Sequence, residues 1–143
     1  MTTITPNQLH SLQAEAMRER GHGGLQEAVE RECKQRGLEY HHHYDSRRSR
    51  AGWPDMVILL ALDVIFVELK RQKTRPTISQ FRWLNLLSSR RCRVYLWRPI
   101  HLLNGTIADV LNGARNIKNN GRWVLGHGVA GDKWSLPVKR GDQ

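Results

Sequence analysis

The feature that most constrains the fold is a pair of short apolar segments, rich in Val and Ile, near the middle of the sequence. They span residues 56–60 and 64–70, and only Ala61-Leu62-Asp63 separates them. Segments of this length and composition are typical of β-strands. Because so short a connection turns the chain back on itself, the sequence predicts two neighbouring antiparallel strands.

Upstream of this strand pair, two amphipathic segments predict helices. Thr5-Pro6-Asn7-Gln8 forms a capping box with Pro at the first helical position, which opens a helix expected to continue to about Arg20. A second helix is expected over residues 25–36, with Leu25, Val29 and Cys33 facing the core and Gly37 as its stop signal. Residues 38–44 then predict a first strand.

Downstream, Thr77-Ile78-Ser79-Gln80 is a second capping box, which opens a helix to about Ser89. Residues 94–97 predict the last core strand, and a helical connection of this length returns the chain parallel to the preceding strand. A short helix is expected within residues 104–111, and the signals weaken beyond Gly113. The pattern predicts an α/β fold with a mixed central sheet flanked by helices.

Charge is concentrated in the same central region. The chain of 143 residues, the usual size of one domain, carries a formal net charge of +10. Residues 46–98 hold twelve Lys and Arg against three Asp and Glu. Clustered positive charge of this kind favours an anionic partner, and its concentration in one stretch favours phosphate contact over mere solubility.

Other classes of protein are disfavoured. No apolar run approaches the roughly 20 residues that a membrane span needs, and the N-terminus lacks the layout of a signal peptide, so we expect a cytoplasmic protein. Cys33 and Cys92 are isolated, which supports neither a disulfide framework nor a Cys-rich zinc site. Residues 41–43 are three consecutive His, but no second ligand pair follows at zinc spacing.

The residues that carry chemistry lie on the two central strands. Glu68 and Lys70 project from the same strand face, because alternate side chains point the same way. Asp55 opens the preceding strand, so pairing of the strands would bring its carboxylate beside Glu68. Two carboxylates at that range repel each other, and a cation held between them explains their juxtaposition best.

The ligand types indicate which cation is expected. Hard carboxylate oxygens, without Cys or suitably spaced His, favour Mg²⁺ or Mn²⁺ over zinc. Beside such an ion, Lys70 could orient an attacking water and stabilise negative charge on phosphorus. The constellation therefore suits hydrolysis of a phosphodiester.

These motifs resemble those of a known family. Pro54-Asp55, Glu68-Leu69-Lys70 and Gln80 are similar to the motifs of the PD-(D/E)xK nuclease superfamily. The run Asp45-Ser46-Arg47-Arg48-Ser49 ahead of Gly52-Trp53-Pro54-Asp55 resembles the VRR-NUC branch of that superfamily. The resemblance covers about residues 25–99 and includes Trp97-Arg98-Pro99 at the end of the last strand.

The resemblance implies a restriction-endonuclease-like core that uses a divalent metal to cut DNA. It assigns Asp55, Glu68 and the Leu69 carbonyl to the metal and makes Lys70 the catalytic lysine. Gln80 would be the helix glutamine near the site, although its position in the capping box gives it an equally good structural role.

One acid of the family pattern is missing. The family usually supplies a further Glu about one turn ahead of the position that Gln26 holds, where this chain has His22-Gly23-Gly24. Glu19, Glu27 or Glu30 could replace it, or the site could work with fewer acids. Glu30 is slightly preferred because it lies four residues after Gln26, on the same helical face.

The expected organisation is a helical extension over residues 1–24, a nuclease core over 25–99, and a helix with a basic tail over 100–143. The DNA-contacting residues are expected to be Arg47, Arg48, Arg50, Lys73 and Arg75.

The expected function is a Mg²⁺- or Mn²⁺-dependent endonuclease, bacterial or phage-encoded and selective for branched or Holliday-junction DNA. Symmetric cutting would need a homodimer, because one short domain carries one site, and the N-terminal helix is a candidate dimer or junction-binding element. A sequence-specific restriction-type enzyme and an inactive DNA-binding module are the alternatives.

Overall fold

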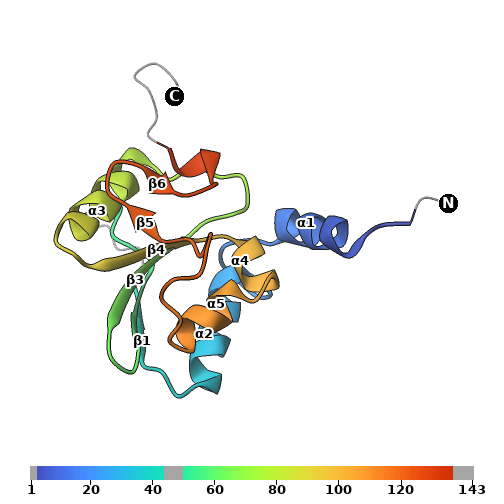
Figure 1. Ribbon diagram of the computed structural model, residues 1–143, viewed down its shortest axis with the longest axis horizontal. Coiled ribbons are helices and arrows are strands. Elements are labelled where there is room, and N and C mark those ends of the chain that lie inside the picture. Colours follow the sequence, from blue (N-terminus) through green and yellow to red (C-terminus); the bar gives the residue numbers. More distant parts are fainter. Residues whose placement is uncertain (1–2, 44–49, 137–143) are drawn as a thin grey trace.

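A four-stranded mixed sheet forms the centre of the molecule (Figure 1). The structure, a computed structural model, describes residues 3–43 and 50–136. The strands are β1 (Tyr40–His42), β2 (Met56–Leu59), β3 (Val64–Leu69) and β4 (Arg93–Trp97), in the order β1-β2-β3-β4. β1 and β3 both run antiparallel to β2, while β4 runs parallel to β3. The predicted antiparallel pair and the predicted mixed sheet are confirmed.

The β2–β3 hairpin has a fixed register. Met56 pairs with Val67 and Leu59 pairs with Val64. Asp63 closes the turn, because its carbonyl accepts the Leu60 N–H at 2.8 Å and its carboxylate accepts the Val64 N–H at 2.8 Å. Register matters here because a slip of one residue would move every side chain to the other face of the sheet.

Three helices cover one face of the sheet: α2 (Leu25–Gln35), α4 (Pro99–Leu103) and α5 (Thr106–Leu111). The four-residue spacing of Leu25, Val29 and Cys33 places these side chains on one stripe of α2, and all three are fully buried. They pack against the β-strand side chains of the same face, including Ile58 and Val67. The burial of this stripe holds α2 on the sheet.

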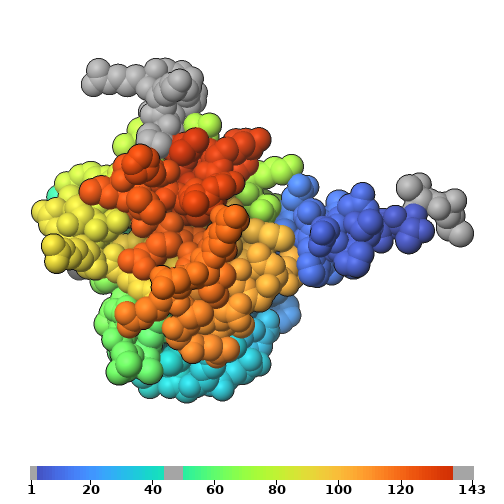
Figure 2. Space-filling view, viewed as in Figure 1, coloured from blue at the N-terminus to red at the C-terminus, as the bar shows by residue number. Residues whose placement is uncertain are grey.

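The opposite face is covered by α3 (Ile78–Ser89) together with a C-terminal segment. That segment contains β5 (Trp123–Val124), β6 (Gly128–Val129) and the short 3₁₀ helix η1 (Lys133–Ser135). Figure 2 shows it in orange and red, lying across one side of the body. Trp123 is buried beside Leu84, and its indole N–H donates to Asn85 at 3.0 Å. The C-terminal segment, where the secondary-structure signals of the sequence are weakest, therefore contributes to a hydrophobic core.

Two helix boundaries differ from expectation. α1 (Pro6–Ala16) has the predicted capping box but ends at Ala16, not near Arg20, because Met17 adopts an extended conformation. The helix expected within residues 104–111 is α5, and Gly105, with a φ of 83°, separates it from α4, which the sequence did not predict. Within the described residues, no helix is long and apolar enough to cross a membrane.

α1 projects from the body of the molecule (Figures 1 and 2). It contacts α4 and buries Ala14, whereas Leu9 and Leu12 remain 47% and 55% exposed. The predicted apolar stripe of this helix is therefore largely exposed.

Gly52 generates the first prediction, because it presses the segment before β2 against the start of α3. It has a φ of 90°, and a Cβ there would lie 2.3–2.6 Å from backbone atoms of Ser79 and Gln80. Gly52→Ala should therefore lower the free energy of unfolding by about 2–4 kcal/mol through backbone strain and overlap. Urea denaturation measures this loss.

Gly37→Ala is the matched control. Gly37 also has a positive φ, of 66°, but a Cβ there would meet nothing within 4 Å. Its substitution should cost about 1 kcal/mol, from backbone strain alone. An equal loss for both variants would contradict the close approach at Gly52.

Candidate active site

Asp55 and Glu68 face each other across the β2–β3 hairpin. Continuing the register by one residue beyond the Met56–Val67 pair places Asp55 opposite Glu68. Both side chains are buried, with residue exposures of 8% and 1%. The Leu69 N–H donates to Asp55 Oδ2 at 2.8 Å and fixes the carboxylate against β3.

The environment of Glu68 disfavours its charge. Burial raises the pKa of Glu68 well above its usual value, and the charge of Asp55 raises it further. The nearby Lys70 lowers this pKa, whereas a hydrogen bond to Asp55 and the charge of Glu19 raise it. Without a further cation, Glu68 therefore favours the protonated form.

Asp55 and Glu68 fit a cation by their chemistry. Glu68 Oε2 is buried and has no hydrogen-bond partner among the described residues. Asp55 Oδ1 is contacted by the Arg20 guanidinium at 3.2 Å, and the Arg20 side chain is 57% exposed. Hard carboxylate oxygens, one of them without a hydrogen-bond partner among the described residues, suit Mg²⁺ or Mn²⁺. These ions keep several bound waters and need one or two carboxylates from the protein.

The set of acids is small. Across residues 3–43 and 50–136, no group of three or more His, Cys, Asp and Glu side chains lies close enough to hold a metal ion. The donors that the structure brings together are the carboxylates of Asp55 and Glu68.

Lys70 supplies a buried positive charge beside this pair. It is 6% exposed, and its backbone N–H donates to the Trp97 carbonyl at 3.0 Å. Strand alternation places its side chain on the same face as Glu68, as expected from the sequence. Leu69 lies between them, with its side chain in the core on the other face.

The loop between α1 and α2 places Glu19 directly ahead of α2. The Leu25 N–H donates to the Arg18 carbonyl at 2.7 Å, and the Gln26 N–H donates to the Glu19 carbonyl at 2.9 Å. In a continuous helix, residue 22 would accept from Gln26. Glu19 therefore stands one helical turn ahead of Gln26 in space, although it is seven residues ahead in sequence.

Glu19 contacts the loop after β3 and influences Glu68. Its charge raises the pKa of Glu68, and its Oε1 accepts the Arg71 N–H at 3.0 Å. The charge of Glu30 raises the pKa of His42 instead, and it is absent from the groups that shift Glu68. Among Glu19, Glu27 and Glu30, Glu19 is therefore the acid whose charge acts on Glu68.

Glu27 and Gln80 have other contacts. Glu27 lies 3.5 Å from His22 Nδ1. Gln80 Oε1 accepts the Thr77 N–H at 2.9 Å, which confirms the capping box. No described contact joins Gln80 to Asp55, Glu68 or Lys70. The described contacts of Gln80 are therefore those of a helix-capping residue.

The residues expected to contact DNA are exposed where the structure describes them. Their contacts are Arg50 with the Trp83 ring at 5.8 Å, Lys73 with Glu15 at 3.0 Å, and Arg75 with the Trp134 ring at 5.7 Å. Arg47 and Arg48 lie outside the described residues.

Sequence reasoning missed Arg98 as a positioning residue. Its side chain is 3% exposed, pairs with Asp132, and donates to the carbonyls of Arg71 and Thr74. It thereby fixes the loop that follows Lys70. The sequence signal for this role was limited to the place of Arg98 at the end of the last strand.

The raised pKa of Glu68 predicts how the stability of the metal-free protein depends on pH. In the folded state, Glu68 keeps its proton to higher pH than in the unfolded state. Its contribution to stability is therefore complete below about pH 4.5, the usual pKa, and is lost as pH rises through the raised value. Glu68→Gln should be more stable than the parent protein at pH 8, in urea denaturation with chelator.

The control for this prediction is Glu39→Gln, which removes an exposed carboxylate. Its effect on the free energy of unfolding should hardly change between pH 4.5 and pH 8. If Glu68→Gln showed the same flat difference, Glu68 would not have the raised pKa described here.

Comparison with known proteins adds no relative. No family model, no curated protein and no solved structure matches this chain. Its function is therefore argued from the contacts of Asp55, Glu68 and Lys70 and from the charge around them.

Proposed function

We propose that this chain is a Mg²⁺- or Mn²⁺-dependent endodeoxyribonuclease with a restriction-endonuclease-like core of the PD-(D/E)xK type, in the VRR-NUC branch. The observation that carries the proposal is the buried pair of Asp55 and Glu68, with the buried Lys70 on the same strand face. A protein has little reason to bury two acids side by side unless a cation offsets their repulsion. The net charge of +10 supports a polyanionic substrate.

The order of the elements supports the proposed core. A helix precedes a strand and a β-hairpin, and α3 then returns the chain to a parallel strand. This order puts the Asp55 carboxylate at the start of β2 and the Glu68 carboxylate near the end of β3, at one edge of the sheet. The PD-(D/E)xK motifs that this sequence resembles require the same placement of the two carboxylates.

Two side chains would hold the metal in this proposal, namely Asp55 and Glu68. The Leu69 carbonyl is the proposed backbone ligand, and Glu19 is proposed to act on the pair through its charge and not as a ligand. When bound, the ion would supply Lewis-acid polarisation of the scissile phosphate.

Lys70 has the remaining chemical role. Its ammonium orients the attacking water and stabilises the negative charge that develops on the phosphoryl oxygens. Burial strengthens this stabilisation because few water dipoles screen the charge. Arg71, which follows directly, is fixed by Glu19 at its N–H and by Arg98 at its carbonyl. The position of Lys70 therefore depends on the segment before α2, which contains Glu19, and on the end of β4, which leads into Arg98.

The basic residues Arg50, Lys73 and Arg75, with Arg47 and Arg48, are proposed to contact the DNA backbone. Contacts of this kind position the strand without reading its sequence. We propose selectivity for branched DNA and action as a homodimer, because one chain carries one site and two symmetric cuts need two. A restriction-type enzyme is separable by its preference for a particular linear sequence.

The direct test of this function is cleavage. The full chain should nick or cut DNA in Mg²⁺ or Mn²⁺ on a panel of duplex, flap and four-way junction substrates, and excess chelator should abolish the reaction. Binding without cleavage under all these conditions would indicate an inactive DNA-binding module.

Variants of the three buried polar residues give a specific prediction. Asp55→Asn, Glu68→Gln and Lys70→Ala should each lower the cleavage rate by about 10²-fold or more, because each removes a group that acts on the transition state. DNA binding, measured by fluorescence anisotropy in chelator, should stay near that of the parent protein. Lys34→Ala, which removes an exposed charge from α2, should leave both unchanged.

Conservative replacement separates two roles of Lys70. Lys70→Arg should rescue the rate poorly, because a planar guanidinium does not replace a compact ammonium in a buried site. Full activity of Lys70→Arg would show that Lys70 only neutralises phosphate. Near-parental activity of Asp55→Asn or Glu68→Gln would contradict the site assignment.

Arg20 generates a further prediction, because its guanidinium contacts the Asp55 oxygen that a metal would take. Arg20→Gln should lower the Mg²⁺ concentration for half-maximal cleavage severalfold, since one competing positive charge is removed. Arg18→Gln is the control, because Arg18 is an exposed neighbour that bonds the His22 carbonyl instead. An increased Mg²⁺ requirement in Arg20→Gln would contradict this competition.

A further inference from the structure

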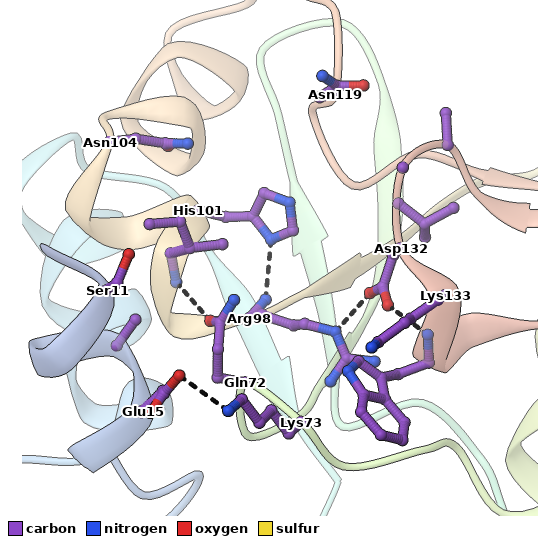
Figure 3. A pocket seen from close by; sticks show the side chains of 16 residues that line it. Ser11, Glu15, Gln72, Lys73, Arg98, His101, Asn104, Asn119, Asp132 and Lys133 are labelled. Atoms are coloured by element: carbon purple, nitrogen blue, oxygen red, sulfur yellow. Dashed lines mark hydrogen bonds and ion pairs between the residues drawn. The ribbon is translucent and has the colours of Figure 1, made fainter. Parts of the chain in front are cut away.

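A second site is suggested by a cavity of about 540 Å³ at the edge of the sheet (Figure 3). One wall is the loop after β3, with Gln72 and Lys73, and another is the start of α4, with His101. α1 contributes Ser11, and the C-terminal segment contributes Asp132, Lys133 and Trp134. Segments that are far apart in the sequence thus line one space.

The cavity lies where the topology of the sheet favours a ligand. β3 and β4 are parallel, so their carboxyl ends meet at this edge. The chain leaves β3 toward α3 on one face and leaves β4 toward α4 on the other. In open α/β sheets, the crevice at such a switch point is the usual ligand site.

Hydrogen-bond donors line this cavity. His101 Nδ1 accepts the Arg98 N–H at 2.9 Å, and burial lowers the pKa of His101 to about 4. The ring is therefore neutral near pH 7 and carries its proton on Nε2, as a donor. Gln72 Oε1 accepts the Ile100 N–H at 3.1 Å, which leaves the amide NH₂ as a second donor.

Positive charge exceeds negative charge around the cavity. Glu15 pairs with Lys73 at 3.0 Å, and Asp132 pairs with the buried Arg98. In the described part of the chain, no carboxylate pairs with Lys133. Arg98 keeps one terminal nitrogen without a hydrogen-bond partner among the same residues.

An aromatic ring completes the wall. Lys133 Nζ lies 4.9 Å from the centroid of the Trp134 ring, and the Arg75 guanidinium lies 5.7 Å from it. Rings with adjacent positive charges are the combination that binds bases and phosphates of single strands. The bases of an ordinary duplex are stacked and paired, so they cannot reach the side chains that line this cavity.

We propose that this cavity binds one unpaired nucleotide of the DNA substrate, with its base against Gln72 and His101 and its phosphate near Lys133. The proposal rests on the nuclease function and names its substrate class as DNA with an unpaired strand at a junction. Gln72 is two residues beyond Lys70, a span of at most about 7 Å of extended chain. The unpaired nucleotide would therefore lie close to the bond that is cut.

The test compares blunt duplex with the same duplex carrying a short single-stranded extension. Binding to the full chain is measured by fluorescence anisotropy in chelator, so that no cleavage occurs. The parent protein should bind the extended DNA more tightly. It should lose this preference when the extension lacks bases, because phosphate contact alone would remain.

Two variants probe the cavity. Gln72→Glu keeps the acceptor for the Ile100 N–H but replaces the donor by a negative charge, and Lys133→Ala removes the unpaired positive charge. Each should weaken binding of the extended DNA about tenfold. Neither should affect blunt duplex more than Lys118→Ala, which removes an exposed charge that does not line the cavity.

The outcomes separate this proposal from the nuclease function. Equal binding of blunt and extended DNA, with cleavage intact, would overturn the cavity proposal alone. Absence of DNA binding would overturn both.

Free deoxynucleoside monophosphates provide a second test of the cavity. Competition with the extension supports a nucleotide site, whereas their binding without any preference for the extension would overturn the assignment to a DNA strand.

Discussion

The opposition of Asp55 and Glu68 across the β2–β3 hairpin is the interaction on which the rest of the candidate site depends. Two buried carboxyl groups at this range are unfavourable when both are ionised. The surrounding contacts offset this repulsion, since Leu69 donates its N–H to Asp55, Arg20 contacts the same carboxylate, and Lys70 adds a positive charge. The fold thus keeps together a pair of acids that would separate in water.

The loops around the pair explain how so small a sheet holds this geometry. Arg71, directly after Lys70, is bound by Glu19 from the segment before α2 and by Arg98 from the end of β4. Arg98 is in turn paired with Asp132 of the C-terminal segment. Residues from four parts of the chain therefore converge beside one strand end. Such a network positions a charged side chain more tightly than the strand alone would.

Local patterns predicted most of the framework. The Val- and Ile-rich segments, the capping boxes at Thr5 and Thr77, and the stripe of Leu25, Val29 and Cys33 each depend on neighbours in sequence, and each is confirmed. The hairpin also brings Asp55 opposite Glu68, since strand register follows from the short turn. For these features, secondary-structure periodicity was sufficient.

Features that depend on distant contacts were not predictable in the same way. α1 ends at Ala16 because Met17 is extended, and the carbonyls of Arg18 and Glu19 then accept hydrogen bonds from the start of α2. The resulting offset of three residues has no signal in the sequence spacing that favours Glu30. The C-terminal segment has no amphipathic period, yet Trp123 is buried between α3 and the sheet. A buried Arg such as Arg98 gives no periodic signal either, because its partners come from two distant segments, the loop after β3 and the C-terminal segment.

Binding of Mn²⁺ to the full chain, followed by electron paramagnetic resonance at neutral pH, tests the central claim most directly, because it needs no substrate. We expect Mn²⁺ to bind the parent protein, and we expect Asp55→Asn and Glu68→Gln each to weaken binding strongly while Glu39→Gln leaves it unchanged. Equal binding by all four proteins, or none by the parent protein, would contradict a metal site at the Asp55–Glu68 pair.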